Sequence, residues 1–451
     1  MPGFHQSRLS GRRFRWPVVA AAPLIAASLL ANVGEIEAAP PSVPASDPAV
    51  ITDWNATAVG TIVTDAGKAN AEAFLWYAFA QAAVYNAVVG ITGSYEPYEW
   101  HARGPKGASP EAAAAAAAHR VLLTYFPASE PRLSAAYEAS LARIPDGPSK
   151  DQGIRFGEHA ANRLIELRVD DGRFAEIAFE VPLAPGVWRP TPPGFAPFFD
   201  PWLSQVRPLL LDSPDQFRPP GPPALTSNAY ATDFAEVRDY GRNTGSLRTP
   251  TQTETALFFS DIGVGPLQAS LRDLVTRRSM NISDSARLFA AVDMSLADAI
   301  VASWDGKFHY GFWRPVTAIQ LADDDGHPDT DAVQGWMPLV VTPPYPDYPS
   351  GLTPVVGALT RTLSRLLGDG RVDLNITSTA AGLPGPPLTR HYEFAAELNR
   401  DVVDARVWSG IHFRTADVVG NAVGTKVGDW ALDHYFQPLT PEHRPVDVGE
   451  A

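Results

Sequence analysis

A run of seven alanines, residues 112–118, places the strongest constraint on how this chain can fold. Alanine is the best helix former, and Pro110, directly before Glu111, suits the first turn of a helix. We therefore expect one helix over residues 111–126. Residues 69–91 are also rich in alanine and carry large apolar side chains on most faces, which predicts a buried helix.

Helical periodicity recurs along most of the remaining chain. Signals for β-strands are scarce. The sequence therefore predicts a mainly α protein, with further helices at 151–169, 233–240, 251–259, 268–277, 284–310, 352–367, 391–406 and 412–435.

The stretch from Val181 to Ala224 differs from its surroundings, because it holds 13 of the 43 prolines. Proline at this density prevents helix formation and removes backbone donors. A flexible linker between domains is one interpretation, but Trp188, Phe198 and Trp202 are too apolar for that role. A long extended segment packed over a helical core fits better, so we expect a single domain over residues 50–440.

Composition excludes several classes of function. A net charge of −14 argues against nucleic acid as a partner, since phosphate backbones attract basic surfaces. The chain has no cysteine, which excludes disulfides, zinc–thiolate sites and iron–sulfur clusters. Hydrophobic residues at 45% and charged residues at 19% are typical of a globular protein.

The N-terminus has the pattern of an export signal. Four arginines between residues 8 and 15 precede an apolar run from Val18 to Val33, followed by Ala38-Ala39-Pro40. The run is shorter than the ~20 residues that a membrane anchor needs, so a signal over residues 1–39 is favoured over an anchor. The Arg12-Arg13 pair suggests twin-arginine export. A secreted or periplasmic protein, without a membrane segment after signal removal, is expected.

The first of three notable blocks in the C-terminal half begins at Lys307 and ends at Arg314-Pro315. Lys307 and Arg314 are seven residues apart, so both would lie on one face of a helix that Pro315 closes. Two like charges without an acidic partner at helical spacing are costly to bury unless an anion joins them. Taken alone, however, the block is more typical of a solvated basic face.

The second block is Pro349-Ser350-Gly351, directly before an apolar helical run. Serine is common at a helix N-cap. In the same position, the hydroxyl and the free amides of the first helical turn can hold an anion, and Gly351 lets the backbone come close. The block by itself does not distinguish these roles.

The third block runs from Arg406 to His412, with Gly410 between them. On one continuous helix this spacing would place the two side chains about 120° apart. Gly410 can end that helix, so that His412 begins the next element. There the helix dipole disfavours protonation and leaves His412 available as a neutral nucleophile or ligand.

The order and spacing of the three blocks resemble vanadium-dependent haloperoxidases and type-2 phosphatidic acid phosphatases. That superfamily has Lys, six residues, Arg-Pro; then Pro-Ser-Gly-His; then Arg, five residues, His. Trp304 and the segment Trp188-Arg-Pro-Thr-Pro-Pro-Gly are similar to exported bacterial haloperoxidase-like proteins, and the resemblance covers nearly the whole mature chain. The fold it implies is a bundle of α-helices. The matching motif residues are Lys307, Arg314-Pro315, Pro349-Ser350-Gly351, Arg406 and His412.

The resemblance also implies roles for these residues. His412 would bond to vanadium in a haloperoxidase, or attack phosphorus in a phosphatase. Vanadate is thus the expected cofactor, phosphate can occupy the same site, and the implied reaction uses hydrogen peroxide to oxidise halide to hypohalous acid. The equatorial oxygens of the anion would be neutralised and hydrogen-bonded by Lys307, Arg314, Ser350, the Gly351 amide and Arg406.

Two positions depart from the family pattern. The fourth residue of Pro-Ser-Gly-His is an acid–base histidine, and here it is Leu352. Loss of a general acid typically slows a reaction roughly 10²–10⁴-fold, so we expect the anion site to persist while turnover falls. His309 is a candidate replacement, although a structural role is favoured. The phosphatases have an aspartate four residues after the histidine, where this chain has Ala416, followed by Asp417.

Three functions therefore remain open. The first is an exported vanadate-dependent haloperoxidase acting on halide, hydrogen peroxide and an organic acceptor. The second is a phosphomonoesterase that uses His412 as nucleophile on a phosphate ester. The third is an oxyanion-binding protein with little turnover, which Leu352 keeps in consideration.

An acidic loop from Asp323 to Asp331 carries five aspartates and His327 within nine residues. Calcium or another cation could bind there, but the spacing is not that of an EF-hand. A solvated acidic loop is the favoured interpretation.

Overall fold

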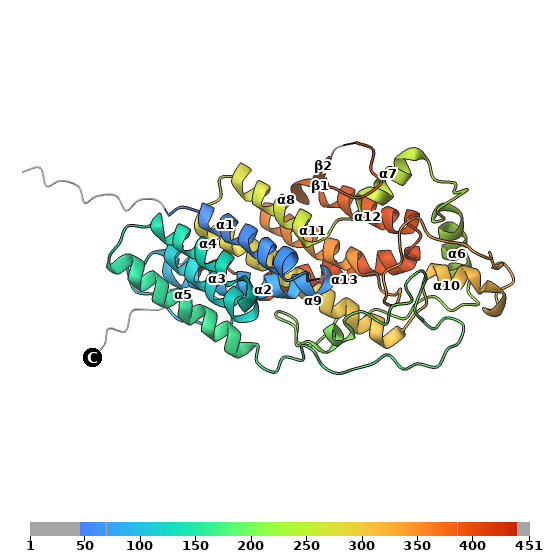
Figure 1. The fold of residues 1–451 in the computed structure, drawn as a ribbon, viewed down its shortest axis with the longest axis horizontal. Helices are drawn as coiled ribbons and strands as arrows, with labels where there is room; N and C mark the ends of the chain where they lie inside the picture. Colours follow the sequence, from blue (N-terminus) through green and yellow to red (C-terminus); the bar gives the residue numbers. More distant parts are fainter. Residues whose placement is uncertain (1–45, 69, 386, 440–451) are drawn as a thin grey trace, which may run out of the picture. The chain divides into compact units, whose positions relative to one another are not determined.

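The computed structural model describes residues 46–68, 70–385 and 387–439 (Figure 1). The predicted export signal, residues 1–39, lies outside these ranges, so the secreted or periplasmic location stays a prediction. The assignment of residues 50–440 to one domain also stays a prediction.

The described residues are mainly helical, as predicted. Short 3-10 or π-helical turns cover residues 60–65, 127–129, 201–205 and 322–324, and one hairpin is formed by β1 (Arg371–Ser378) and β2 (Leu388–Phe394). The α-helices are α1 (Ala49–Val59), α2 (Asn70–Thr92), α3 (Pro110–Tyr125), α4 (Glu130–Ala142), α5 (Pro148–Leu167), α6 (Asn228–Tyr240), α7 (Pro250–Phe258), α8 (Val264–Arg277), α9 (Ile282–Tyr310), α10 (Pro315–Gln320), α11 (Leu352–Leu367), α12 (Ala395–Trp408) and α13 (Arg414–His434).

Helix α9 is the centre of the packing. Every residue from Leu288 to Lys307 is buried, which is typical of a helix surrounded by protein on all sides. Helices α2, α11 and α13 all pack against it. The last turn of this buried helix carries Lys307, so the core itself positions the first of the predicted site residues.

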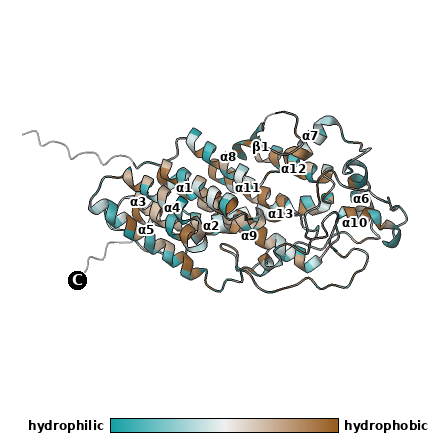
Figure 2. Cartoon of the chain, in the orientation of Figure 1, coloured by the Kyte–Doolittle hydropathy of each residue, from teal (hydrophilic) through white to brown (hydrophobic). Residues whose placement is uncertain are grey.

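The alanine run lies in α3, and all seven alanines are buried. Helix α5 approaches them closely: a Cβ added to Gly157 would lie 2.2 Å from the carbonyl oxygen of Ala113. Figure 2 shows mixed hydrophilic and hydrophobic residues along α5, and Phe156, Ala160 and Leu164 form its buried face. The alanines of α3 therefore have two effects. They favour helix formation, and their small side chains allow α5 to pack closely against α3.

The expected helices over 111–126 and 352–367 are observed as α3 and α11, within one residue at each end. The predicted helix over 391–406 is wrong at its start, because residues 388–394 form β2 and α12 begins only at Ala395. The sequence did not indicate the hairpin, because the alternating apolar residues of β1, from Val372 to Ile376, span too few positions to exclude a helix. Helices α1 and α4 were also not expected.

The proline-dense segment, residues 181–224, is extended and packed, as predicted. Trp188 and Trp202 are buried in the core. The carboxylate of Asp298, inside α9, accepts three hydrogen bonds of 2.6 to 2.9 Å from the backbone amides of residues 209–211. Because a buried carboxylate needs such donors, this contact ties the segment to the central helix.

Helices α11 and α13 approach each other through glycines. A Cβ added to Gly424 of α13 would lie 1.9 Å from the carbonyl oxygen of Pro354, and one added to Gly357 of α11 would lie 2.3 Å from that of Asn421. This close packing holds the N-terminal ends of α11 and α13 side by side, and residues 350 and 351 precede α11 while residue 412 precedes α13.

One helix among the described residues has the length and hydropathy of a membrane span. It covers Ala71–Thr92 in α2, with a mean hydropathy of 1.4, and 94% of it is buried inside the protein. Burial on this scale is typical of a core helix.

The glycine contact predicts a large loss of stability in Gly424→Ala. The added methyl group would overlap a backbone carbonyl, so we expect the free energy of unfolding to fall by about 3 kcal/mol, measured by chemical denaturation. Gly265→Ala in α8 is the matched control, because nothing lies within 4 Å of its added Cβ. That variant should be as stable as the parent or slightly more stable. Equal stability of both variants would contradict the packing described here.

Candidate oxyanion site

The predicted site residues come from five different elements and meet at one place. All of them are buried: Lys307, Arg314, Ser350 and His412 are 0% exposed and Arg406 is 6% exposed. Lys307 is in the last turn of α9, Arg314 directly precedes α10, Ser350 and Gly351 precede α11, Arg406 is in the last turn of α12, and His412 is in the loop before α13.

The expectation that Lys307 and Arg314 share one helix face is wrong. Helix α9 ends at Tyr310, and Gly311 has a left-handed backbone (φ 53°) that turns the chain away. Arg314 then has an extended backbone, and Pro315 begins α10 instead of closing α9. The two cations are therefore brought together by a turn, which seven-residue spacing alone does not reveal.

The other two blocks are also arranged differently from the expectation in detail. Gly351, rather than Ser350, is the residue at the N-cap of α11. Gly410 ends the preceding helix with φ 79°, as predicted, but α13 begins only at Arg414. His412 therefore lies in the connecting loop, where the helix dipole is not its main environment.

His412 lies between the carboxylate of Asp347 and the guanidinium of Arg314. Its Nδ1 lies 2.7 Å from Oδ1 of Asp347, and its Nε2 lies 3.0 Å from Nη1 of Arg314. Nη1 of Arg314 lies 3.3 Å from Nδ1 as well, so it faces both ring nitrogens. The close carboxylate of Asp347 accepts, which places the ring proton on Nδ1, from which it is donated to Asp347. The lone pair of Nε2 is thus available to an electrophile or a metal.

The surroundings favour a neutral His412. Burial lowers its pKa well below the usual value, and the charges of Arg314, Lys307 and Arg406 lower it further. Burial raises the pKa of the Asp347 carboxyl to about 7, against the opposing effect of Arg314 and Lys307. Desolvation, not the helix dipole, therefore keeps the imidazole unprotonated.

Lys307 is surrounded by the loop that follows α10. Its ammonium donates to the carbonyl oxygens of Pro346, Asp347 and Pro349 at 2.8, 3.2 and 2.6 Å. The ring of Tyr345 lies between the cations, with its centre 4.8 Å from Lys307 Nζ and 4.7 Å from the guanidinium carbon of Arg314. Burial lowers the pKa of Lys307.

Several buried donors at this place lack a partner among the described residues. They are Nη2 of Arg314, Nε of Arg406 and the hydroxyl of Ser350. The side chain of Arg406 makes no hydrogen bond or ion pair with any described residue, which is unusual for a buried guanidinium. Unpartnered buried donors beside a neutral histidine fit an oxyanion such as vanadate or phosphate.

Asp417 is close to these donors but does not contact His412. Its carboxylate is buried and neither oxygen has a partner among the described residues. Burial raises its pKa well above the usual value, against the opposing charge of Arg406. Asp347, which the sequence analysis did not select, therefore orients His412 in place of the aspartate after the histidine.

Leu352 occupies the position of the missing acid–base histidine, and His309, the candidate replacement, is not part of the site. Leu352 begins α11 and is half-buried beside Gly351. His309 is exposed, and its ring contacts that of Tyr310. The structural role that was favoured for His309 agrees with this placement.

Asp347 and Tyr345 are the residues that sequence reasoning missed. Both lie in Tyr345-Pro-Asp-Tyr-Pro349, directly before the serine block. An aspartate confined between two prolines next to a cationic motif was the available signal. Its partner, 65 residues further along the chain, could not be identified from spacing.

The acidic loop is largely satisfied by its own donors. The carboxylate of Asp325 accepts hydrogen bonds from the hydroxyls of Tyr230 and Thr330 and from the amide of His327. These contacts favour a structural role over cation binding.

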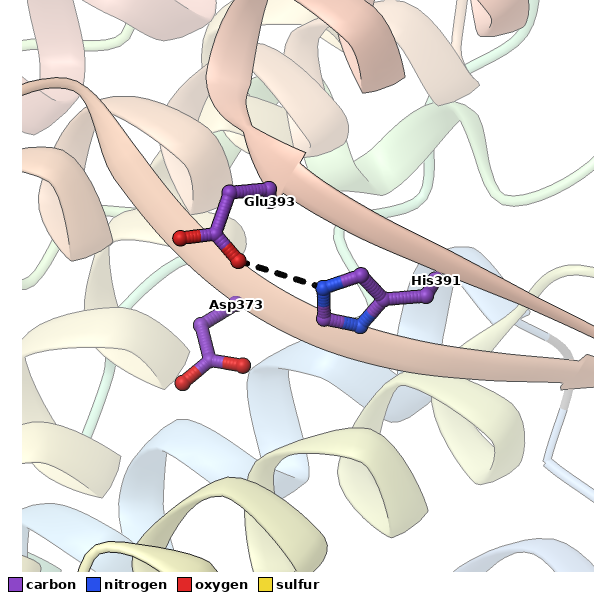
Figure 3. Close-up of side chains that lie close together, drawn as sticks. All are labelled: Asp373, His391 and Glu393. Atoms are coloured by element: carbon purple, nitrogen blue, oxygen red, sulfur yellow. Dashed lines mark hydrogen bonds and ion pairs between the residues drawn. The ribbon is translucent and has the colours of Figure 1, made fainter. Parts of the chain in front are cut away.

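A different group of potential metal ligands lies on the hairpin, where Asp373, His391 and Glu393 face one another (Figure 3). Asp373 is already paired with Arg277 and Arg278, and Glu393 with the arginine that begins β1. These carboxylates are thus neutralised by arginine, so the group is an ion-pair network.

Comparison with known proteins gives the site its context. The family model of the VCPO second helical-bundle domain matches residues 287–440, the range that holds all three motif blocks. Vanadium chloroperoxidase of Curvularia inaequalis is 25% identical over 371 residues, which are 63% of this chain. The chain spans only 60% of the length of that relative.

The fold is also found in solved structures. A bacterial vanadium-dependent iodoperoxidase superposes with a TM-score of 0.72 at 22% identity, covering 88% of this chain and 98% of its own. A holo-type bacterial vanadium-dependent chloroperoxidase gives 0.67 at 18% identity, covering 86% and 97%. The predicted resemblance is confirmed: this chain has the fold of the vanadium haloperoxidases, and its residues 287–440 match the model of the VCPO second helical-bundle domain.

Proposed function

We propose that this protein binds vanadate at His412 and uses hydrogen peroxide to oxidise halide. The observation that carries the proposal is the set of unpartnered donors on Arg314, Ser350 and Arg406 around a neutral imidazole. Its location within the segment that matches the vanadium chloroperoxidase family supports the same ligand.

The donor set has the charge that an oxyanion needs. Lys307, Arg314 and Arg406 supply three positive charges, and Asp347 and Asp417 return at most two negative charges, since burial raises the pKa of both carboxyls. An anion that enters offsets the remaining positive charge and supplies acceptors to the free donors. Bound vanadate would supply the activation of hydrogen peroxide.

Each residue then has a separate task. Nε2 of His412 would bond to the anion and exchange its present contact with Nη1 of Arg314 for that bond. Asp347 holds the Nδ1 proton, which fixes the tautomer and raises the basicity of the ring. Arg406 and Ser350 would bind oxygens, and the Gly351 amide would add a backbone donor.

Leu352 limits the rate in this proposal. A leucine can neither deliver nor accept a proton where the family has a histidine, so proton transfer is left to water. The anion would be bound while turnover is slow.

Phosphate-ester hydrolysis is the second candidate, and the Asp347–His412 hydrogen bond favours it. A histidine whose Nδ1 proton is held by a carboxylate is a better nucleophile at Nε2. Without an acid at residue 352, only esters with good leaving groups, such as aryl phosphates, would react at an appreciable rate.

Bromination of a dione dye with bromide and hydrogen peroxide tests the first candidate. The purified protein should be active only after addition of orthovanadate, and His412→Ala should be inactive because the bond to vanadium is lost. A folded protein that releases phosphate from an aryl ester but does not brominate would favour the second candidate. A protein with neither activity that still binds vanadate would be an oxyanion-binding protein.

Leu352→His should increase peroxidase activity by roughly 10²-fold or more, since it restores an acid–base group at the pocket. Leu352→Asn, which is polar but does not titrate near neutral pH, is the matched control and should not gain activity. If the two variants behave alike, proton transfer at residue 352 is not what limits turnover.

Asp347→Asn should weaken vanadate binding roughly 10–100-fold, because the charge that supports His412 is removed while an acceptor for Nδ1 remains. The dissociation constant can be measured by isothermal titration calorimetry. The exposed Asp146→Asn serves as control and should bind like the parent, since Asp146 contacts only Lys150. Unchanged affinity in Asp347→Asn would contradict the role given to this carboxylate.

A further inference from the structure

A pocket of about 190 Å³ lies next to the oxyanion site. Gly351, Leu352 and Arg406 form the part of its wall that the two share, together with the rings of Trp304 and Tyr345. Most of the other side chains that line it are apolar, among them Phe74, Phe259, Ile262, Val340, Val341 and Val355, and polar atoms are also exposed in its wall.

The charge of the wall restricts what can bind. Arg406 is the only charged residue among those that line the pocket in the described part of the chain, and its side chain has no partner there. A cationic ligand would face this guanidinium, and no carboxylate lines the pocket to attract it. The pocket therefore favours a neutral or anionic molecule.

Leu352 and Val341 contribute apolar surface at the inner wall and at the rim of the pocket. Leu352 is half-buried where a titratable side chain would have made the wall polar. Val341 is 67% exposed, so it lies where the pocket meets the solvent. Covering these apolar side chains with an apolar molecule is favourable, and a pocket lined by apolar and aromatic side chains together with a few polar groups is typical of small-molecule sites.

We propose that this pocket binds the organic acceptor, an apolar aromatic molecule that is neutral or carries one negative charge. The inference rests on the proposed function. The hypohalous acid produced beside Gly351 and Arg406 would transfer its halogen to a ring carbon of the bound molecule. The carbon–hydrogen bond of that ring carbon breaks, its proton joins the hydroxide of the hypohalous acid, and water leaves.

Binding of 2-naphthol, a small apolar aromatic, tests the pocket without any catalysis. Isothermal titration calorimetry of the full-length protein, without vanadate or peroxide, should show one site. Val341→Asp should weaken the affinity roughly tenfold or more, because a carboxylate would replace apolar surface at the rim. Val169→Asp is the matched control: Val169 is 59% exposed and does not line the pocket, so its affinity should equal that of the parent. No binding, or equal loss in both variants, overturns the proposal.

Competition between two acceptors separates this proposal from the function on which it rests. 2-Naphthol and the strongly polar 4-hydroxybenzenesulfonate are brominated together, by the enzyme and by reagent hypobromous acid. A bound acceptor predicts that the enzyme favours 2-naphthol several-fold beyond the reagent ratio, and that Val341→Asp returns the ratio to that of the reagent. Vanadate-dependent bromination at the reagent ratio overturns the pocket proposal alone. No bromination of either acceptor overturns the proposed function as well.

Discussion

The desolvation of three cations in one region is the constraint on which the site depends. Lys307, Arg314 and Arg406 are removed from water, yet the protein supplies hydrogen-bond acceptors for only part of their donors. Lys307 is satisfied by three loop carbonyls and Arg314 by two carbonyls and His412, whereas Arg406 has no partner among the described residues. Burying a charge without a partner is costly. The fold can retain this arrangement because a rigid frame of helices holds it, and an anion would relieve it.

The frame of helices that holds the site depends on residues far from it. The buried α9 positions Lys307, and the glycine contacts between α11 and α13 bring the ends of these helices together. Asp298 ties the proline-dense segment to α9 through three amides. The same desolvation that makes the cations costly also keeps His412 neutral. One physical cause therefore prepares both the anion-binding donors and the nucleophilic nitrogen.

Sequence reasoning located most of this site but not its geometry. Alanine-rich and apolar segments identified α2 and α3, because their propensity and their packing agree. The motif residues were identified by order and spacing, and the structure brings their side chains to one place. The prediction that Lys307 and Arg314 share a helix face was wrong. Gly311 adopts a left-handed backbone that ends the helix, and a helical sequence pattern does not indicate this. The partner of His412 was also missed, because the hydrogen bond to Asp347 joins residues that only tertiary folding brings together.

Leu352 and Asp347 have opposite effects on the reactivity expected of the site. In the proposed function, Asp347 would strengthen His412 as a ligand or nucleophile, while Leu352 supplies no proton donor and adds apolar surface to the neighbouring pocket. The two residues together fit the proposal that the site binds an oxyanion firmly and receives an apolar molecule beside it. Vanadate binding, rather than the rate of turnover, is therefore the property that tests the proposed function most directly.

The most direct measurement is the stoichiometry of orthovanadate bound to the purified full-length protein, determined by equilibrium dialysis with and without competing phosphate. One vanadate per chain is expected, displaced by phosphate and lost in both His412→Ala and Arg406→Ala. A folded protein that binds no vanadate, or that binds it equally well in these variants, would contradict the assignment of this pocket as an oxyanion site.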